Sequence, residues 1–484
     1  MIGVTGYGGY IPRLRLGRMT IYQAAGWFAP ATMAVAQGER SVCNWDEDSL
    51  SMAVEASRDC LVGLDRSTID AVHLCSTTLP YADRQNAGIL ATALNLPKTA
   101  VTADFTGSLR AGTTGLLGAL DGLAAGTKRA ALVATADKRE AKGAYFYEMW
   151  FGDGAAALLL GTEDVIAEFV GSYSVTYDLA DHYRGTEKRF DYTWEERWVR
   201  DEGYTKIIPE AINGLLDKTG LAIGDFARIV YPCFFGREHQ GIAKTVGATK
   251  DQVMGNLHQI CGETGTAHPL VMFAKALQEA KPGDLILVAS FGQGCDALAF
   301  RVTDAIADLP ARMGVNGFLD RKRELDSYTK FATFRKTLDF DTGIRAEGGG
   351  QIAMTTLYRN RKMILGLVGG RCTACGTPQF PRARICVNPE CGFVGDMEDY
   401  EFAERQGRVI MYTGDMLAIS ADPPAIYGIV QFDDGGRILA DFTDCTLDEV
   451  SVGCPVHMSF RRRWVDEQRG YTGYFWKAVP QQQA

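Results

Sequence analysis

The chain reads Gly152-Asp-Gly-Ala-Ala-Ala-Leu158 in its first half and Gly292-Gln-Gly-Cys-Asp-Ala-Leu298 in its second. Each glycine-containing stretch lies beside an apolar run typical of a buried strand, Ala130-Ala-Leu-Val-Ala-Thr135 for the first and Leu285-Ile-Leu-Val-Ala-Ser290 for the second. The repetition indicates an internal duplication and predicts a pseudo-twofold α/β fold. Two unrelated hairpins of the βGxGβ type would give the same pattern, so that alternative stays open here.

Helical stretches between the strand runs extend the α/β pattern over residues 1 to about 305. One helix is predicted from Asp48 to Leu64, because acidic residues favour a helix N-terminus, and another from Ser108 to Leu123. After residue 365 the chain changes to short β-rich runs separated by turns, which is typical of a small antiparallel barrel. We therefore expect an α/β part over 1–345, a linker helix with a metal-binding segment over 346–395, and a barrel over 396–484.

The composition is that of an ordinary globular protein. Of the 484 residues, 46% are hydrophobic and 23% charged, and the formal net charge of −9 argues against a nucleic-acid partner. No apolar run reaches the roughly 18 to 20 residues of a membrane span. The N-terminus lacks the basic region of a signal peptide, so we expect a cytoplasmic protein with reduced thiols.

Four of the twelve cysteines cluster in the segment between 372 and 391. Cys372-Thr-Ala-Cys375 forms one pair, and Cys386 and Cys391 follow after a short spacer. Two such pairs in a reduced chain predict tetrahedral zinc bound by four thiolates, which leaves no open coordination position and makes the metal structural. The alternative is four thiols without a metal.

Several segments resemble hydroxymethylglutaryl-CoA synthases of the bacterial and archaeal kind. They are the opening Gly3 to Arg15, Trp45-Asp-Glu-Asp-Ser-Leu-Ser-Met-Ala-Val-Glu-Ala56, the stretch from Asp104 to Thr113, and Gly152-Asp-Gly-Ala-Ala156. The C-terminal Gly370-Arg-Cys-Thr-Ala-Cys-Gly-Thr377 and Phe380-Pro-Arg-Ala-Arg-Ile-Cys386 resemble the zinc-ribbon and OB-fold domain that accompanies many thiolase-type enzymes.

The resemblance covers roughly residues 1 to 340 and implies a thiolase-like, pseudo-twofold, five-layer fold. It also implies an acyl-CoA ligand and a homodimer formed through the segment from Ala100 to Leu123. A further thiolase-type subunit as a partner stays open. The zinc ribbon and OB fold are expected to follow the thiolase-like domain.

The family's catalytic residues do not carry over. The segment that holds its nucleophilic Cys reads Gly107-Ser-Leu-Arg-Ala-Gly-Thr113, which puts Leu109 at the Cys position. The segments of its His and of its general-acid Glu place Pro232 and Thr77 at those positions. The flanking residues still align, so the sequence indicates a rebuilt site.

Other residues are candidates for replacing the lost catalytic groups. In Cys261-Gly-Glu-Thr-Gly-Thr-Ala-His-Pro269, which resembles a loop that enters the family's active site, Glu263 is a candidate general base and His268 lies close by. Cys233 is a candidate relocated nucleophile, and the phenol of Tyr147 or its neighbour Tyr145 a candidate proton donor. The structural alternatives are a helix-capping Glu263, a helix N-terminal His268, a buried Cys233 thiol and core tyrosines.

Basic residues in an insertion rich in Tyr and Trp, namely Arg184, Arg197 and Arg200, are candidates for binding the CoA phosphates. A solvated helix would carry the same residues.

Three functions remain open from the sequence. The first is an acyl-CoA lyase or aldolase that makes or breaks a C–C bond by an aldol or retro-aldol step, without a Cys acyl-enzyme. The second is a Claisen or thiolase-type acyltransferase with a relocated Cys. The third is a non-catalytic acyl-CoA-binding subunit of a thiolase complex.

Overall fold

The computed structural model describes residues 1–193, 195–341 and 353–481. This chain forms two compact units. The first consists of Met1–Cys43, Asp48–Ala91 and Leu96–Thr337, and the second of Asn44–Glu47, Thr92–Asn95 and Leu338–Ala484. The expected boundary at residue 345 lies outside the described residues.

The first unit is built on a nine-stranded sheet in the order β11-β12-β13-β8-β1-β7-β6-β4-β5. Its strands are β1 Gly3–Tyr10, β4 Ala71–Cys75, β5 Val101–Phe105, β6 Ala131–Lys138, β7 Asp153–Gly161, β8 Ala167–Thr176, β11 Arg228–Val230, β12 Leu285–Phe291 and β13 Gly294–Val302. Two antiparallel hairpins, β6–β7 and β12–β13, contain the two glycine-containing stretches. The duplication predicted from these stretches therefore has a structural counterpart.

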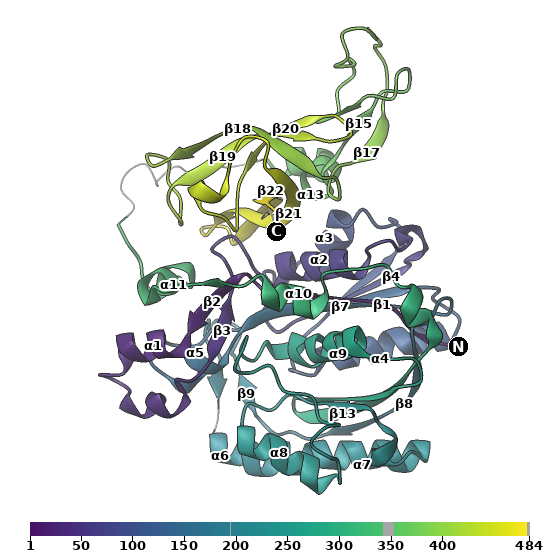
Figure 1. Ribbon diagram of the computed structural model, residues 1–484, viewed down its shortest axis with the longest axis vertical. Coiled ribbons are helices and arrows are strands. Elements are labelled where there is room, and N and C mark those ends of the chain that lie inside the picture. The colour runs from purple at the N-terminus through teal and green to yellow at the C-terminus, as the bar shows by residue number, and fades with distance from the viewer. Residues whose placement is uncertain (194, 342–352, 482–484) are drawn as a thin grey trace. The chain divides into compact units, whose positions relative to one another are not determined.

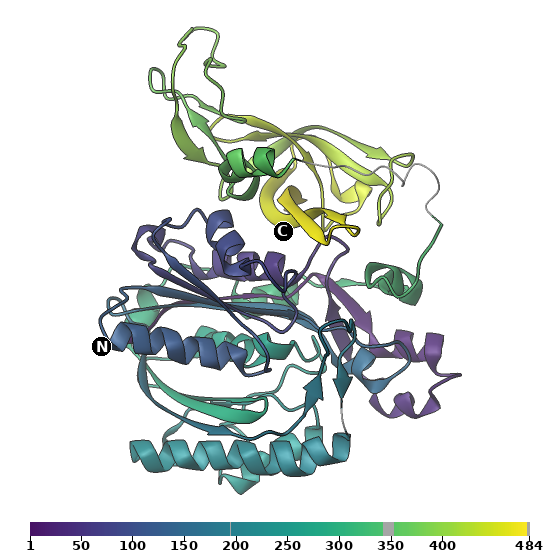
Figure 2. The same cartoon turned by 180° about the vertical axis from the view of Figure 1, so that it is seen from behind.

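Helices lie on both sides of the strands and between them. The central helices α4 (Ala111–Ala124) and α9 (His268–Glu279) lie between the layer of β1 and β7 and the layer of β8 and β13 (Figures 1 and 2). The outer helices are α2 Ser49–Cys60 and α3 Asn86–Ala93 over one face, and α7 Ile208–Thr219 and α8 Gly236–Thr245 over the other. Helix α10, Gly314–Asp320, packs against β1 and the central helix α9. The predicted five-layer, thiolase-like fold is confirmed.

Smaller elements complete the first unit. A three-stranded sheet contains β2 Leu14–Gly17, β3 Glu39–Val42 and β14 Arg323–Glu324, beside α1 Arg18–Ala25, α5 Phe146–Trp150 and α11 Tyr328–Phe334. The insertion forms β9 His182–Tyr183, β10 Tyr192–Thr193, α6 Glu196–Trp198 and a π-helix, η3 Val199–Ile207. Short 3-10 turns are η1 Pro30–Val35, η2 Arg66–Thr68, η4 Ile223–Asp225, η5 Gly265–Ala267 and η6 Asp304–Asp308.

The second unit contains a zinc-ribbon segment and a barrel. After α12 Met354–Arg359 and α13 Arg361–Leu365, the ribbon sheet has β15 Val368–Arg371, β16 Pro378–Gln379 and β17 Glu398–Glu401. The barrel strands, in the order β20-β19-β18-β21-β22, are β18 Gly407–Asp415, β19 Ala425–Phe432, β20 Arg437–Asp441, β21 Pro455–Asp466 and β22 Tyr471–Pro480, with η8 Leu447–Glu449. A bridge between Phe442 and Ala478 connects the two edges. The predicted antiparallel barrel is confirmed.

The inward-facing residues of β19 explain the barrel core. Ile426, Val430 and Phe432 are buried, whereas the alternate residues of this strand are partly exposed, as the two-residue period of a strand requires. Phe460 and Trp476 pack their rings against each other inside the same barrel. Burial of these large aromatic side chains stabilises the barrel.

Candidate functional site

A small pocket lies beside Leu109 in the first unit. Its volume is about 20 Å³, which is room for roughly one water molecule. Aromatic and aliphatic walls enclose several ionisable groups; the lining residues are Leu109, Arg139, Tyr147, Phe151, Asp181, His182, Thr193, Glu196, Val199, Tyr204, Phe234 and Phe235. Half of these residues belong to the segment from 181 to 204, which we call the capping segment.

The π-helix η3 forms one wall of this pocket. Val199 and Tyr204 are five residues apart and both are buried, because the i to i+5 repeat of a π-helix puts them on one face. The Tyr204 ring packs against Phe291 and meets Phe234 edge to face, and Phe234 stacks on Trp150. This aromatic packing closes the pocket to larger ligands in the observed conformation.

Arg139 lies at the centre of a buried ion cluster. Its Nη1 donates to Glu263 Oε2 at 2.6 Å and its Nε donates to Asp191 Oδ2 at 2.8 Å. Burial lowers the pKa of Arg139, but the carboxylates of Glu263 and Asp191 outweigh this effect and hold it above its usual value. The guanidinium lies 3.8 Å from the ring centroid of Phe151. Arg139 is therefore a fixed, permanently charged cation in the pocket wall.

The loop that carries Glu263 is held against the start of β7. Glu263 N–H donates to Trp150 O at 2.7 Å and Gly152 N–H donates to Glu263 O at 2.8 Å. A Cβ on Gly152 would lie 1.9 Å from Cys261 O, so only glycine allows this approach. The glycine-containing stretch of the first half thereby fixes the position of the Glu263 carboxylate.

Glu263 accepts a second hydrogen bond, from Gly265 N–H at 2.9 Å, just before α9. The capping contact that was the structural alternative for this residue is thus present, together with the ion pair to Arg139. These two donors occupy both oxygens of the carboxylate and hold it in place. A role as general base for Glu263 stays a prediction.

Tyr147 and Glu196 both line the pocket and contact each other. Glu196 accepts hydrogen bonds from Tyr145 and Tyr147, and burial raises its pKa despite these donors. Burial also raises the pKa of Tyr147, which has a hydrogen bond with Thr193. Tyr147 therefore keeps its proton at neutral pH and can donate it to a bound substrate.

A carboxylate–imidazole pair comes from the capping segment. His182 Nδ1 lies 3.0 Å from Asp181 Oδ2, and the two side chains are 11% and 5% exposed. Both residues line the pocket that Leu109 lines.

The residues at the family's three catalytic positions make packing contacts and hydrogen bonds within the protein. Leu109, at the Cys position, is 8% exposed and faces the pocket. Thr77, at the Glu position, donates from N–H and Oγ1 to Asp137 at 2.8 and 3.0 Å. Pro232 follows β11 and precedes Phe234 and Phe235, which fill the pocket.

Cys233 and His268 are buried but neither lines the pocket. Burial raises the pKa of Cys233 to about 12, and its thiol contacts Phe235 O at 3.5 Å. His268 accepts from Thr264 N–H at Nδ1 and donates to Asn256 O at Nε2, with distances of 3.1 and 2.7 Å. Burial lowers the pKa of His268, and both ring nitrogens are engaged.

The three candidate phosphate-binding arginines have different environments. Arg184 donates to Asp191 at 3.0 Å and also to Thr77 O, so it belongs to the buried ion cluster. Arg200 pairs with Asp201 at 2.7 Å and with Glu238 at 3.7 Å. Arg197 is exposed on α6. The structure does not bring these three guanidinium groups together around one pocket.

The four predicted zinc ligands come together in the second unit. The Sγ atoms of Cys372, Cys375, Cys386 and Cys391 all lie within 4.8 Å of one another. Cys372 and Cys391 Sγ are 3.8 Å apart, and Cys375 and Cys386 Sγ are 3.6 Å apart. Tetrahedral zinc with Zn–S bonds of about 2.3 Å requires sulfur separations of about 3.8 Å. The residues therefore fit a structural zinc.

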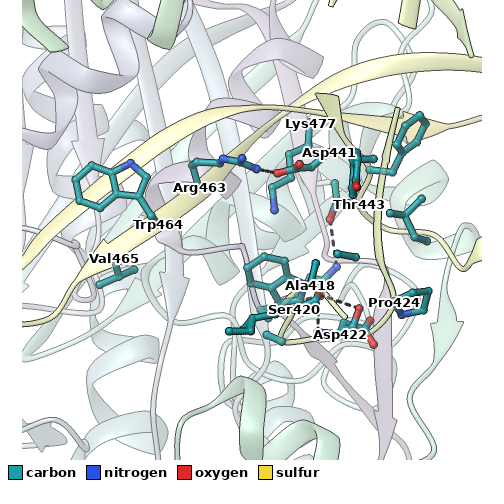
Figure 3. Close-up of a pocket in the computed structure, with 18 of the residues that line it drawn as sticks. Ala418, Ser420, Asp422, Pro424, Asp441, Thr443, Arg463, Trp464, Val465 and Lys477 are labelled. Atoms are coloured by element: carbon teal, nitrogen blue, oxygen red, sulfur yellow. Dashed lines mark hydrogen bonds and ion pairs between the residues drawn. The ribbon is translucent and has the colours of Figure 1, made fainter. Parts of the chain in front are cut away.

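The second unit also contains a larger groove of about 1310 Å³ in the barrel. Figure 3 shows Arg463, Asp441 and Lys477 on one side and Ser420 and Asp422 on the other. Its acidic lining residues, Asp422, Asp441, Asp444, Asp466 and Glu467, outnumber its two basic ones. Lys477 donates to Asp46 at 2.7 Å, and Arg463 pairs with Asp441. The groove is therefore a poor match for the CoA phosphates.

Comparisons with known proteins agree with this architecture. Residues 216–302 match the C-terminal part of 3-oxoacyl-(acyl-carrier-protein) synthase III. Residues 364–398 match the rubredoxin-like zinc ribbon domain of ChsH2, and residues 401–461 match the C-terminal OB-fold domain of ChsH2. The zinc ribbon and the OB fold predicted from the sequence are thus both confirmed.

Curated relatives match about two thirds of the chain. Hydroxymethylglutaryl-CoA synthase of Aeropyrum pernix is 33% identical over 343 residues, which are 69% of this chain and 94% of the relative. This chain belongs to the hydroxymethylglutaryl-CoA synthase family. The synthase of Archaeoglobus fulgidus is 31% identical over 332 residues, 67% of this chain and 96% of the relative. The family resemblance stated from the motifs is confirmed.

Solved structures support the thiolase-like fold of this family member. The chain resembles 3-oxoacyl-(acyl carrier protein) synthase III of Pseudomonas aeruginosa with a TM-score of 0.55 and 22% identity, covering 63% of this chain and 98% of that one. It also resembles OleA of Xanthomonas campestris, with a TM-score of 0.56 and 17% identity, covering 62% of this chain and 98% of that one. In the part of the chain that the structure describes, no helix is both long and apolar enough to cross a membrane.

Sequence reasoning missed Arg139, Asp181, His182 and Glu196. Arg139 directly follows the buried strand β6, and a charge at the end of such a strand was a usable signal. The adjacent acid and imidazole at 181 and 182 were another. Glu196 gave no signal, because it lies in an insertion that is rich in charges throughout.

Proposed function

We propose that this family member acts on an acyl-CoA by forming or cleaving a C–C bond in an aldol or retro-aldol step, without a Cys acyl-enzyme. One observation carries the proposal. Leu109 stands at the family's nucleophile position and faces a pocket whose lining offers acids, bases and a cation but no thiol. These groups suit proton transfer and charge stabilisation, which an aldol step needs.

The chemistry follows from the positions of the charged groups. In the cleavage direction, a base removes the proton of the β-hydroxyl, the bond between Cα and Cβ breaks, and its electron pair becomes the thioester enolate. Arg139 is the fixed cation that can stabilise the enolate oxygen. Tyr147 can then protonate Cα, so a carbonyl compound and a shortened acyl-CoA are released.

Glu263, the base suggested by the sequence, lies behind Arg139 and is bound to it. We propose that its main effect on the reaction is to hold the guanidinium in place. A relocated Cys is less well supported, because the pKa of Cys233 is raised to about 12 by burial and thiolate is the reactive form.

A non-catalytic acyl-CoA-binding subunit is the second candidate. The absence of a Cys, His and Glu at the family's three catalytic positions, where this chain has Leu109, Pro232 and Thr77, is the observation that favours it. Activity of the purified chain alone separates the two candidates.

The test uses a panel of β-hydroxyacyl-CoA thioesters that includes hydroxymethylglutaryl-CoA. Chromatography with mass detection should find a shortened acyl-CoA and a carbonyl product, while the intact protein mass stays unchanged. No turnover of any thioester, or an acyl adduct on the unmodified protein, would refute the proposal.

We also propose a cytoplasmic homodimer formed through the segment from Ala100 to Leu123. Its support is that β5 is an edge strand of the nine-stranded sheet and that Val101 at its start is 54% exposed. An edge strand with exposed apolar residues is suited to pairing with a second copy.

A further inference from the structure

We propose that Asp181 and His182 of the capping segment are the general base of this site, in place of the His and Glu that the family has at other positions. The inference rests on the proposed C–C bond chemistry and names the residue that takes the β-hydroxyl proton. Nothing in the family motifs points to this pair, because it lies in the insertion.

The first support is the geometry of the pair. The 3.0 Å contact joins His182 Nδ1 to Asp181 Oδ2, and Asp181 accepts no other side-chain hydrogen bond among the described residues. His182 Nε2 has no hydrogen-bond partner in the part of the chain that the structure describes. A carboxylate that binds one ring nitrogen keeps the proton on that nitrogen and leaves a lone pair on the other. His182 Nε2 is therefore the available proton acceptor.

The second support is the position of the pair relative to a proton donor. His182 pairs with Thr193 across the β9–β10 ribbon, and Thr193 has a hydrogen bond with Tyr147. His182, the proton acceptor, and Tyr147, the proton donor, thus lie close together in the pocket that Leu109 also lines. In cleavage, Nε2 takes the hydroxyl proton, the Cα–Cβ electron pair passes to the enolate, and the Tyr147 proton goes to Cα. His182 then returns its proton to the Tyr147 oxygen, and the cycle closes without a co-reactant.

Several ionisable groups surround His182. Asp181, Arg139, Tyr147, Glu196 and Tyr204 line the same pocket, and Asp191 interacts electrostatically with His182. A general base acts only in its unprotonated form, so an acidic limb of the kcat/KM profile that belongs to this base should be absent in His182→Gln.

The experiment combines kinetics with a readout that does not need turnover. His182→Gln and Asp181→Asn should each lower kcat by about 10² to 10⁴ with hydroxymethylglutaryl-CoA, or with whichever panel thioester the wild type converts. Imidazole added to His182→Ala should restore part of the rate, which a merely structural role would not allow. His457→Gln, in the barrel, is the matched control and should keep the wild-type rate.

Histidine NMR separates failure of this proposal from failure of the proposed function. The signal that is missing in His182→Gln identifies His182, and it should shift when hydroxymethylglutaryl-CoA is added to the wild type. If the signal shifts without turnover, the C–C bond function fails and His182 is a binding residue only. If turnover proceeds and His182→Gln retains the full rate, the assignment of the base fails while the function stands.

Discussion

Replacing Glu263 by Gln tests whether this carboxylate is the base or the support of Arg139. The wild-type carboxylate accepts from Arg139 Nη1 at 2.6 Å and from Gly265 N–H at 2.9 Å, and its side chain is 8% exposed. A glutamine has one acceptor oxygen, so its NH2 group must face one of these two donors. The substitution keeps the volume of the side chain but removes the charge that neutralises Arg139.

The size of the effect on stability follows from these contacts. Loss of one partner of a buried ion pair costs about 3 to 5 kcal/mol, and a hydrogen bond to a charged group contributes about 1.5 to 3 kcal/mol. Asp191 still pairs with Arg139 in the variant, at 2.8 Å from Nε. We therefore expect a loss of about 2 to 3 kcal/mol in the free energy of unfolding of the first unit, or about 5 °C in Tm.

Kinetics then distinguish the two roles. If Glu263 supports Arg139, Glu263→Gln and Arg139→Lys should both lower kcat, and the acidic limb of the pH profile should persist, because the base is elsewhere. If Glu263 is the base, the acidic limb should disappear and kcat should fall by about 10² to 10⁴ with little change in substrate binding.

The assay is steady-state turnover as a function of pH, together with calorimetric unfolding of the same samples. Glu279→Gln at the far end of α9 is the control, since that side chain is 39% exposed and should change stability by less than about 0.5 kcal/mol. Loss of the acidic limb in Glu263→Gln with unchanged Tm would refute the support role. Unchanged rate and unchanged Tm would refute both.

Four further outcomes are expected. Metal analysis should find about one zinc per chain, and Cys375→Ser should lose it and unfold the second unit at lower temperature. Light scattering at micromolar concentration should give a dimer that Val101→Lys shifts towards monomer, because a charge blocks strand pairing. Iodoacetamide at pH 8 should modify Cys233 about 10³-fold more slowly than an ordinary thiol, because its pKa is raised to about 12. The Cys233→Ala variant should turn over substrate at the wild-type rate. Burial raises the pKa of Asp59 to about 6, so urea unfolding should show the first unit losing about 3 kcal/mol as pH rises from 4 to 7, a slope absent in Asp59→Asn.

The features that sequence predicted well depend on local spacing. The two pairs that begin with Cys372 and Cys386 specify a ligand set almost without the rest of the fold, because each pair spans a tight turn. The alternation in β19 and the apolar runs of β6 and β12 likewise report burial directly. The fold and the metal site were accessible for this reason.

The pocket was less accessible because its contacts join distant parts of the chain. Arg139 meets Glu263 across 124 positions and Asp191 across 52. No periodicity records such pairs. Resemblance pointed to the loop containing Glu263, but the ion pair between Glu263 and Arg139 appears only in three dimensions.

The way in which the family's three catalytic positions are occupied argues that the site was rebuilt as a whole. Thr77 is bound to Asp137, Leu109 closes one wall, and the residues after Pro232 supply the bulky Phe234 and Phe235. A thiol restored at 109 alone would therefore gain a nucleophile without the partner groups of an acyltransferase. The ionisable groups of the pocket now come mainly from the capping segment, which contains none of these three positions. An aldol step needs acids, bases and a cation but no thiol. The substitutions that remove the thiol needed for acyl transfer therefore leave the groups that an aldol step uses.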